Sequence, residues 1–176
     1  MKIHKLLFLA GTRFRNPSLW SHYRDLKLSE KWNLDQLRNL QQDRLLRFLE
    51  HTGTYSAYYN KVFHSLGWKK GTPVSMDLFS RIPEMTKETL LRENEAIHTR
   101  FSYPKLFYCE TSGTSGQVLT FRRNESWDSF NRASILRGYS WFGVQGWDFN
   151  LYFWGYNFSG LKKLRMRIMD KLVNRY

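Results

Sequence analysis

The chain has 176 residues, which is enough for one domain and, as a prior, too few for two. Its content of 41% hydrophobic and 17% aromatic residues excludes a disordered or collagen-like chain. Lysine and arginine number 28 against 15 acidic residues, and this surplus of 13 positive charges attracts anions such as nucleic acid, nucleotide phosphates or acidic membrane surfaces.

Signals for a cellular compartment are few. The single cysteine, Cys109, can form neither an intramolecular disulfide nor a CxxC zinc pair, which favours a reducing compartment. The early apolar run at residues 6–10 is shorter than the core of a signal peptide, and no stretch approaches the length of a membrane span. The sequence therefore predicts a cytoplasmic chain that does not cross a membrane, and leaves a peripheral membrane contact open.

The first third of the chain is predicted to be helical. An arm interrupted at Pro17 leads into a helix, and a second helix covers residues 33–50, with Gly53 as its stop signal. Apolar residues then recur at helical spacing over residues 55–66 and end at Gly67, which is typical of an amphipathic helix that packs its aromatic stripe into a core.

Shorter elements and two strands follow. One or two helical turns are expected at residues 77–79, and Thr86 is the expected cap of the next helix. Residues 105–110 and 117–122 have the aromatic and alternating character of half-buried strands. A long helix is then predicted over residues 124–141.

The last part of the chain adds a strand and a helix. The nearly continuous apolar run at residues 149–154 predicts a strand of a parallel sheet covered on both faces, so the order strand, helix, strand indicates an α/β fold. Residues 161–176 form a basic amphipathic pattern with six Lys or Arg and one Asp. This final helix is expected either to pack on a domain core or to lie on a membrane surface.

One loop between the two predicted strands has a composition that suits a ligand. Its glycines let successive backbone N–H groups turn inward as an anion-binding nest, and its hydroxyls add further donors. It is neither a Walker loop, because Gly116 is followed by Gln117, nor a nucleophile elbow. A plain polar hairpin turn has the same composition, so both interpretations stay open. The loop residues are Thr111, Ser112, Gly113, Thr114, Ser115 and Gly116.

The sequence ETSGTSGQ, from Glu110 to Gln117, resembles the phosphate loop of adenylate-forming enzymes, within the branch of phenylacetate-CoA ligases and CapK-type capsular polysaccharide proteins. The likeness covers roughly residues 35–160 with matching spacing. The other segments that carry it are residues 46–52, Tyr58 with Tyr59, and residues 82–88, 91–94, 122–124, 142–148 and 154–156.

The resemblance implies a fold and a reaction. Residues 1–34 would be an N-terminal arm and helix, and residues 35–176 an incomplete N-terminal portion of the adenylation domain, a helical region followed by the start of a mixed sheet with flanking helices. The activity implied is ATP-dependent activation of a carboxylic acid with Mg²⁺, followed by transfer to coenzyme A or another thiol, with a link to capsular or surface polysaccharide biosynthesis. The loop residues 111–116 would bind the β- and γ-phosphates, and Tyr156 would line the acid pocket unless it merely packs.

The sequence departs from the family in two respects. Gln117, Val118 and Leu119 replace the Lys-Pro-Lys of the wider superfamily, so the loop offers no lysine to phosphate. Family members are much longer, so we expect a fragment that is inactive alone, and the sequence identifies no catalytic residue or metal ligand.

Two alternative functions stay open. They are a basic nucleic-acid-binding module, for which no binding motif is present, and a peripheral membrane module without catalytic activity.

Overall fold

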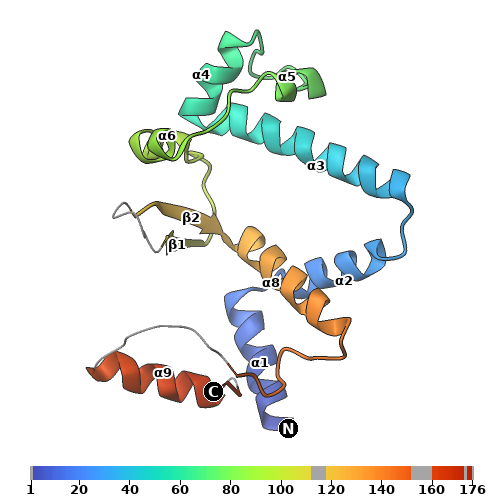
Figure 1. Cartoon of the computed structure of the whole chain (residues 1–176), viewed down its shortest axis with the longest axis vertical. Helices are drawn as coiled ribbons and strands as arrows, with labels where there is room; N and C mark the ends of the chain where they lie inside the picture. Colours follow the sequence, from blue (N-terminus) through green and yellow to red (C-terminus); the bar gives the residue numbers. More distant parts are fainter. Residues whose placement is uncertain (1, 112–117, 152–159, 173, 176) are drawn as a thin grey trace. The chain divides into compact units, whose positions relative to one another are not determined.

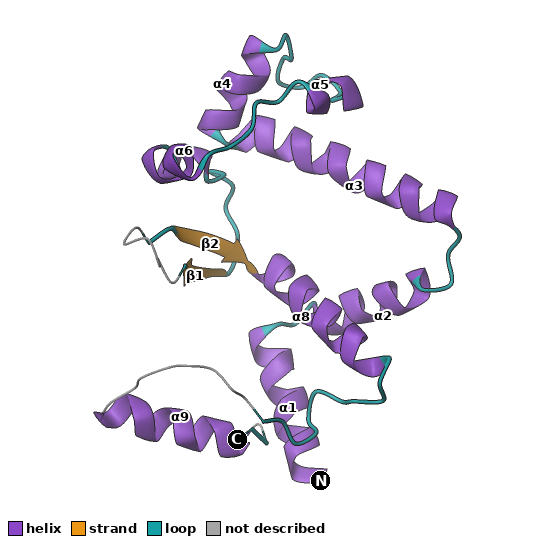
Figure 2. Ribbon diagram, in the orientation of Figure 1, coloured by secondary structure: helices purple, strands orange, loops and turns teal. Residues whose placement is uncertain are grey.

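The structure is a computed structural model that describes residues 2–111, 118–151, 160–172 and 174–175 (Figure 1). The chain forms two compact units. Unit 1 combines Met1–Glu30 with Glu125–Tyr176, and unit 2 is Lys31–Asn124. Helices dominate both units, and the strands that the structure describes lie in unit 2 (Figure 2).

Unit 2 begins with a helical pair. Helix α3 (Leu34–Tyr55) starts at a capping box, in which the Asn33 side chain accepts from the Gln36 backbone N–H and the Gln36 side chain accepts from the Asn33 N–H. Helix α4 (Ala57–Ser65) follows directly, capped by the Ser56 hydroxyl. The short helices α5 (Met76–Ser80), α6 (Lys87–Arg92) and α7 (Asn94–Ile97) complete the helical part.

The core of unit 2 lies between α3, α4 and α5. Leu49, Phe63, Trp68 and Leu78 are buried together, and Tyr59 packs against them, so Phe63 and Tyr59 of α4 lie in the core as the sequence predicted. The predicted helix over residues 55–66 is shorter in the structure, because Tyr55 ends α3 and α4 begins at Ala57. The prediction that α3 stops at Gly53 was wrong, because the helix continues through this residue to Tyr55. Gly53 instead permits the close approach of Phe63, since a Cβ at Gly53 would lie 2.6 Å from the Phe63 Cδ2 atom.

Two strands close unit 2. Strands β1 (Leu106–Glu110) and β2 (Thr120–Asn124) form a two-stranded antiparallel sheet. Their register pairs Leu106 with Asn124 at one end and Glu110 with Thr120 at the other. The predicted strands are therefore confirmed, with the second one beginning at residue 120, a few residues later than expected.

Unit 1 contains four described helices. They are α1 (Lys2–Arg15), α2 (Leu19–Ser29), α8 (Glu125–Ser140) and α9 (Gly160–Leu172). Helix α2 packs on α8, and Leu19, Leu26 and Ala133 form the buried core between them. Residues 2–15, predicted as an arm, are instead helical, and the Phe8 ring holds α1 to the unit by edge contacts with Trp20 and Trp147.

The fold is thus mixed, with helices and a small antiparallel sheet. The predicted parallel-sheet strand at residues 149–154 appears only as an isolated parallel bridge between Asn150 and Arg175, and residues 152–154 lie outside the described part of the chain. Within the described ranges no helix combines the length and apolar character needed to cross a membrane.

Candidate phosphate-binding hairpin

The Thr/Ser/Gly segment connects β1 to β2, and its neck is closed by two hydrogen bonds. The Thr111 N–H donates to the Leu119 carbonyl at 3.0 Å, and the Leu119 N–H donates to the Thr111 hydroxyl at 3.1 Å. These bonds extend the antiparallel pairing by one step beyond Glu110 and Thr120. The two ends of the connecting segment are therefore held together at Thr111 and Leu119.

Of the residues predicted to bind phosphate, the structure describes only Thr111. Its hydroxyl oxygen already accepts from Leu119, so this side chain stabilises the neck of the hairpin. Ser112, Gly113, Thr114, Ser115 and Gly116 lie outside the described residues, and so does the predicted pocket residue Tyr156.

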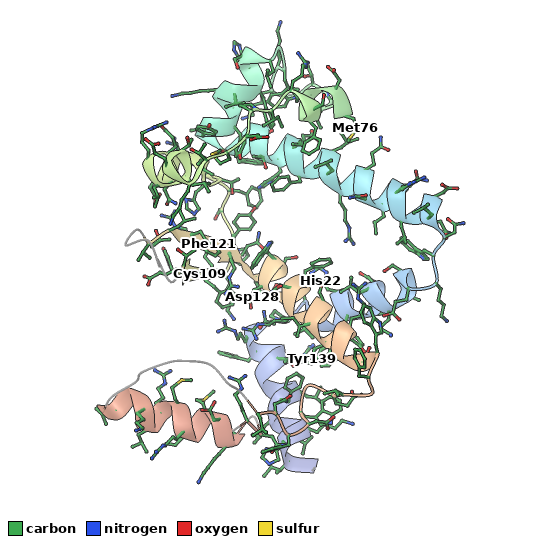
Figure 3. The ribbon with its side chains drawn as sticks, viewed as in Figure 1. His22, Met76, Cys109, Phe121, Asp128 and Tyr139 are labelled. Atoms are coloured by element: carbon green, nitrogen blue, oxygen red, sulfur yellow. The ribbon has the colours of Figure 1, made fainter. Side chains whose placement is uncertain are left out.

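Alternate residues of the sheet face opposite sides, as the strand pattern predicts. Phe107 and Cys109 are half-buried, whereas Leu106 and Tyr108 are exposed. Cys109 pairs across the sheet with Phe121, which is also half-buried (Figure 3). One face of the hairpin is thus sheltered, and the sheet keeps a defined register up to the neck.

Helix α7 anchors the outer edge of β2. The Asn94 side-chain amide donates to the Thr120 carbonyl at 3.0 Å. His98 Nδ1 lies 2.8 Å from the Asn94 carbonyl, which can only accept, so Nδ1 carries the proton and Nε2 is free to accept from the Arg122 backbone N–H at 3.2 Å. These side chains form hydrogen bonds with backbone groups of β2 that would otherwise be unpaired at the edge of the sheet.

An ion pair adds to this anchor. Arg122 Nη2 lies 2.8 and 2.9 Å from the two carboxylate oxygens of Glu95. The guanidinium also lies 5.8 Å from the ring centroid of Tyr108 on the paired strand. Sequence reasoning missed the roles of Asn94, Glu95 and His98, and the available signal was that Asn94 and His98 stand four residues apart on one side of a helical turn.

A further cluster of aromatic side chains holds the segment that leads into β1. His51 of α3 lies 2.8 Å from the Tyr103 hydroxyl through Nε2, and its ring also contacts Phe101. Burial lowers the pKa of His51, so the neutral imidazole is favoured and its Nε2 can accept a hydrogen bond from the Tyr103 hydroxyl. The approach to the hairpin is therefore tied to the helical core of unit 2.

The charge near the hairpin is moderately positive. Lys105, Arg122 and Arg123 stand against Glu110 in residues 105–124, a surplus of two. Part of this charge is compensated, because Arg122 pairs with Glu95. Among the described residues no group of three or more His, Cys, Asp or Glu side chains could hold a metal ion.

Unit 1 contains a second polar cluster, at the start of α8. Asp128 is 1% exposed and accepts from Asn16 Nδ2 and Arg132 Nε, each at 2.8 Å (Figure 3). Burial alone would raise the pKa of Glu125, but the hydrogen bonds from Ser129 and Ser18 lower it overall. Each carboxylate also bonds to the α1–α2 junction, Asp128 to Asn16 and Glu125 to Ser18, which is a structural role.

Comparison with known proteins found no family model, no curated protein and no solved structure that matches this chain.

Proposed function

We propose that the segment between β1 and β2 binds the polyphosphate of ATP in an enzyme that activates carboxylic acids as acyl-adenylates. The observation that carries this proposal is the sequence ETSGTSGQ at residues 110–117, together with its position in a hairpin connection whose neck is fixed by Thr111. A fixed neck supports the proposal because holding the two ends of a binding loop in place reduces the entropy lost when the ligand binds.

The proposed role of the loop is to bind and orient phosphate. Peptide N–H groups around Gly113 and Gly116 would donate to the β- and γ-phosphate oxygens, and the hydroxyls of Ser112, Thr114 and Ser115 would add neutral donors. Glycine is required at such positions because the backbone must approach the ligand closely. Thr111 would contribute indirectly, through the neck that it closes.

The reaction that this binding would serve is adenylation. A substrate carboxylate oxygen attacks the α-phosphorus of ATP, the bond to the bridging oxygen breaks, and pyrophosphate leaves. Donors held at the β- and γ-phosphates would stabilise the charge that develops on the leaving group, and one such donor commonly lowers the activation free energy by about 3 kcal/mol. Mg²⁺ bound with ATP would supply additional charge neutralisation. The thiolate of coenzyme A or of another thiol would then attack the acyl carbonyl carbon, the bond from this carbon to the phosphate oxygen would break, and AMP would leave.

The first test is binding of inorganic tripolyphosphate and of AMP to the 176-residue chain by isothermal titration calorimetry. We expect tripolyphosphate to bind and AMP, which lacks the β- and γ-phosphates, to bind at least about tenfold more weakly. Gly113→Val and Gly116→Val should each weaken tripolyphosphate binding by a similar factor. In the enzyme that carries this segment, the same variants should abolish ATP–pyrophosphate exchange.

A matched glycine control separates specific binding from general attraction to a basic chain. Gly138 lies in α8, where an added Cβ meets open space, so Gly138→Val introduces the same side chain at a site away from the loop. This variant should bind tripolyphosphate as the native chain does. If Gly113→Val and Gly116→Val also bind normally while circular dichroism remains unchanged, the assignment of the loop is wrong.

A further inference from the structure

Helix α1 has an inner side that is committed to unit 1. Phe8 contacts Trp20 and Trp147, with ring centroids 6.5 and 5.9 Å apart, and its ring packs against Gly146 so closely that a Cβ there would clash. Lys5 Nζ lies 4.9 Å from the Trp147 ring centroid. These contacts fix the rotation of α1 about its axis.

The opposite side of α1 is apolar and exposed. Its residues recur at i, i+3, i+4, i+7 and i+11, which places them on one face of a helix. Phe14 is 87% exposed, Leu6 66% and Ile3 64%, and Leu7 and Ala10 on the same face are exposed as well. A helix of 14 residues that packs one aromatic inward therefore presents a continuous apolar face outward. We call this set, Ile3, Leu6, Leu7, Ala10 and Phe14, the α1 outer face.

Helix α1 itself carries no acidic side chain. Residues 1–24 contain five Lys or Arg and no acidic residue. Unit 1 as a whole has 14 Lys or Arg against six Asp or Glu, so it carries +8 of the net +13. Of the six acids, Asp128 is buried against Arg132, and Glu30 pairs with Lys27. The acidic side chains of unit 1 are thus in part compensated internally.

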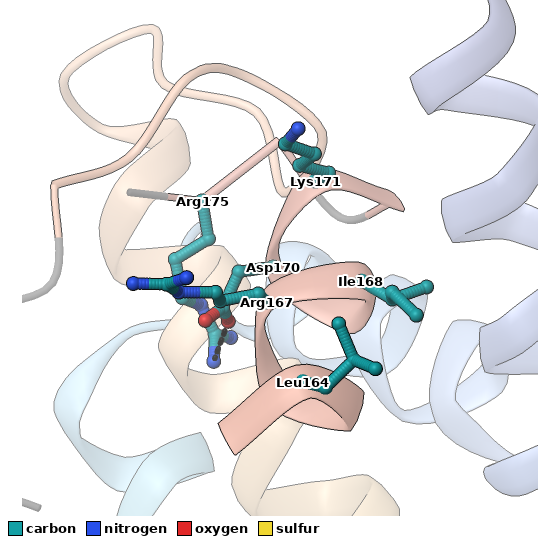
Figure 4. A pocket seen from close by; sticks show the side chains of 6 residues that line it. All are labelled: Leu164, Arg167, Ile168, Asp170, Lys171 and Arg175. Atoms are coloured by element: carbon teal, nitrogen blue, oxygen red, sulfur yellow. Dashed lines mark ion pairs between the residues drawn. The ribbon is translucent and has the colours of Figure 1, made fainter. Parts of the chain in front are cut away.

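Helix α9 also combines exposed apolar residues with basic residues. Leu161, Leu164, Ile168 and Leu172 form an exposed apolar stripe, whereas Met166 and Asp170 on the other side are partly buried. Figure 4 shows a hollow beside the end of α9, lined mainly by apolar and cationic side chains. The cations are Arg167, Lys171 and Arg175, of which Arg175 forms an ion pair of 3.9 Å with Asp170.

We propose that unit 1 binds anionic membrane surfaces, with the α1 outer face inserted at the level of the lipid headgroups, and with Arg13 of α1 and the exposed basic side chains of α9 facing lipid phosphates. An apolar helical stripe with Lys and Arg beside it is typical of helices that lie in the membrane interface. An anionic lipid surface also complements the charge of unit 1, which has a surplus of eight positive charges. Long basic side chains can reach the headgroups while their stems cover apolar surface.

The test is sedimentation of the full chain with lipid vesicles. We expect binding to phosphatidylcholine vesicles that contain roughly one third phosphatidylserine, and at least about tenfold weaker binding to phosphatidylcholine alone. Binding should weaken as NaCl is raised from about 0.05 to 0.5 M, because screening acts on the charged headgroups. Leu6→Glu and Phe14→Glu should each reduce binding to the anionic vesicles at least tenfold.

Phe48 supplies a matched control in unit 2. It is 63% exposed on α3, so Phe48→Glu makes the same chemical change away from the α1 outer face and should leave vesicle binding unchanged. Equal losses in the Phe48 and Phe14 variants would overturn the proposal. So would failure of the native chain to bind anionic vesicles, or self-association in solution that Leu6→Glu abolishes while vesicle binding persists.

A fluorescence measurement tests the insertion of α1 without using the Leu6→Glu and Phe14→Glu variants. In a Cys109→Ser chain, Leu6→Cys carrying an environment-sensitive fluorophore should brighten and shift to the blue on anionic vesicles, whereas the same label at Phe48→Cys should not. An unchanged spectrum at position 6 would contradict insertion of α1. This inference is independent of the phosphate-binding proposal, because α1 belongs to unit 1 and the hairpin to unit 2.

Discussion

Gly53 provides the sharpest test of how unit 2 is packed. This residue lies inside α3, where glycine is normally unfavourable, so alanine there should stabilise the helix if nothing else intervened. An alanine Cβ would, however, lie 2.6 Å from Phe63 Cδ2 and 3.0 Å from Trp68 Cζ3. Both rings are buried in the core, so neither can move away into solvent.

The expected magnitude follows from two opposing terms. Replacing glycine by alanine in a helix gains about 1 kcal/mol, whereas forcing an extra methyl group into a packed core costs about 1–3 kcal/mol. We therefore expect Gly53→Ala to lower the free energy of unfolding by roughly 1 kcal/mol. Gly11 of α1 has no atom within 4 Å of an added Cβ, so Gly11→Ala should raise it by about 0.5–1 kcal/mol instead.

Urea unfolding followed by far-UV circular dichroism measures both changes. Hydrogen exchange of peptides from residues 45–66 should localise the loss in Gly53→Ala to the contact between α3 and α4. In a Phe63→Leu background, which removes the ring that the methyl group would meet, the cost of Gly53→Ala should shrink. If Gly53→Ala stabilises the chain as Gly11→Ala does, the close approach of Phe63 is wrong.

Two further predictions concern the ends of helices. Asn33→Ala should cost about 1 kcal/mol of stability by removing the capping box of α3, whereas Asn33→Asp should retain most of it, as urea unfolding would reveal. Glu125→Gln should destabilise unit 1 by roughly 1–2 kcal/mol near pH 7, because the amide removes the negative charge and one of the two oxygens that accept from Ser18 and Ser129. The folded-state pKa of Glu125 is lowered, so its stabilising effect is present above the unfolded pKa of about 4.3 and disappears as the pH falls through the folded value. The difference between Glu125→Gln and the native chain should vanish over that acidic range, and a difference that persists below it would contradict the role given to the carboxylate.

Part of the candidate site could be predicted from the sequence, and part of it became visible only in the tertiary structure. The Thr/Ser/Gly composition and the flanking strands were visible in the sequence, because turn residues and half-buried strands leave local patterns. The contacts of Asn94 and His98 with β2 could not be predicted from the sequence. The two side chains lie 24 to 26 residues away from their partners in β2, and a strand whose backbone groups bond to such distant side chains has no distinguishing sequence pattern.

By itself the sequence determined most helices and both strands. Capping residues such as Thr86 and the helical spacing of α4 act over a few neighbouring residues, so their effect can be predicted without knowing what lies across the core. Tertiary structure decided that Gly53 continues a helix, since the nearness of Phe63 and Trp68 explains a glycine there. It also decided that residues 1–30 join residues 125–176 in one unit, because burial of Leu19 and Leu26 against Ala133 depends on contacts that no local pattern records.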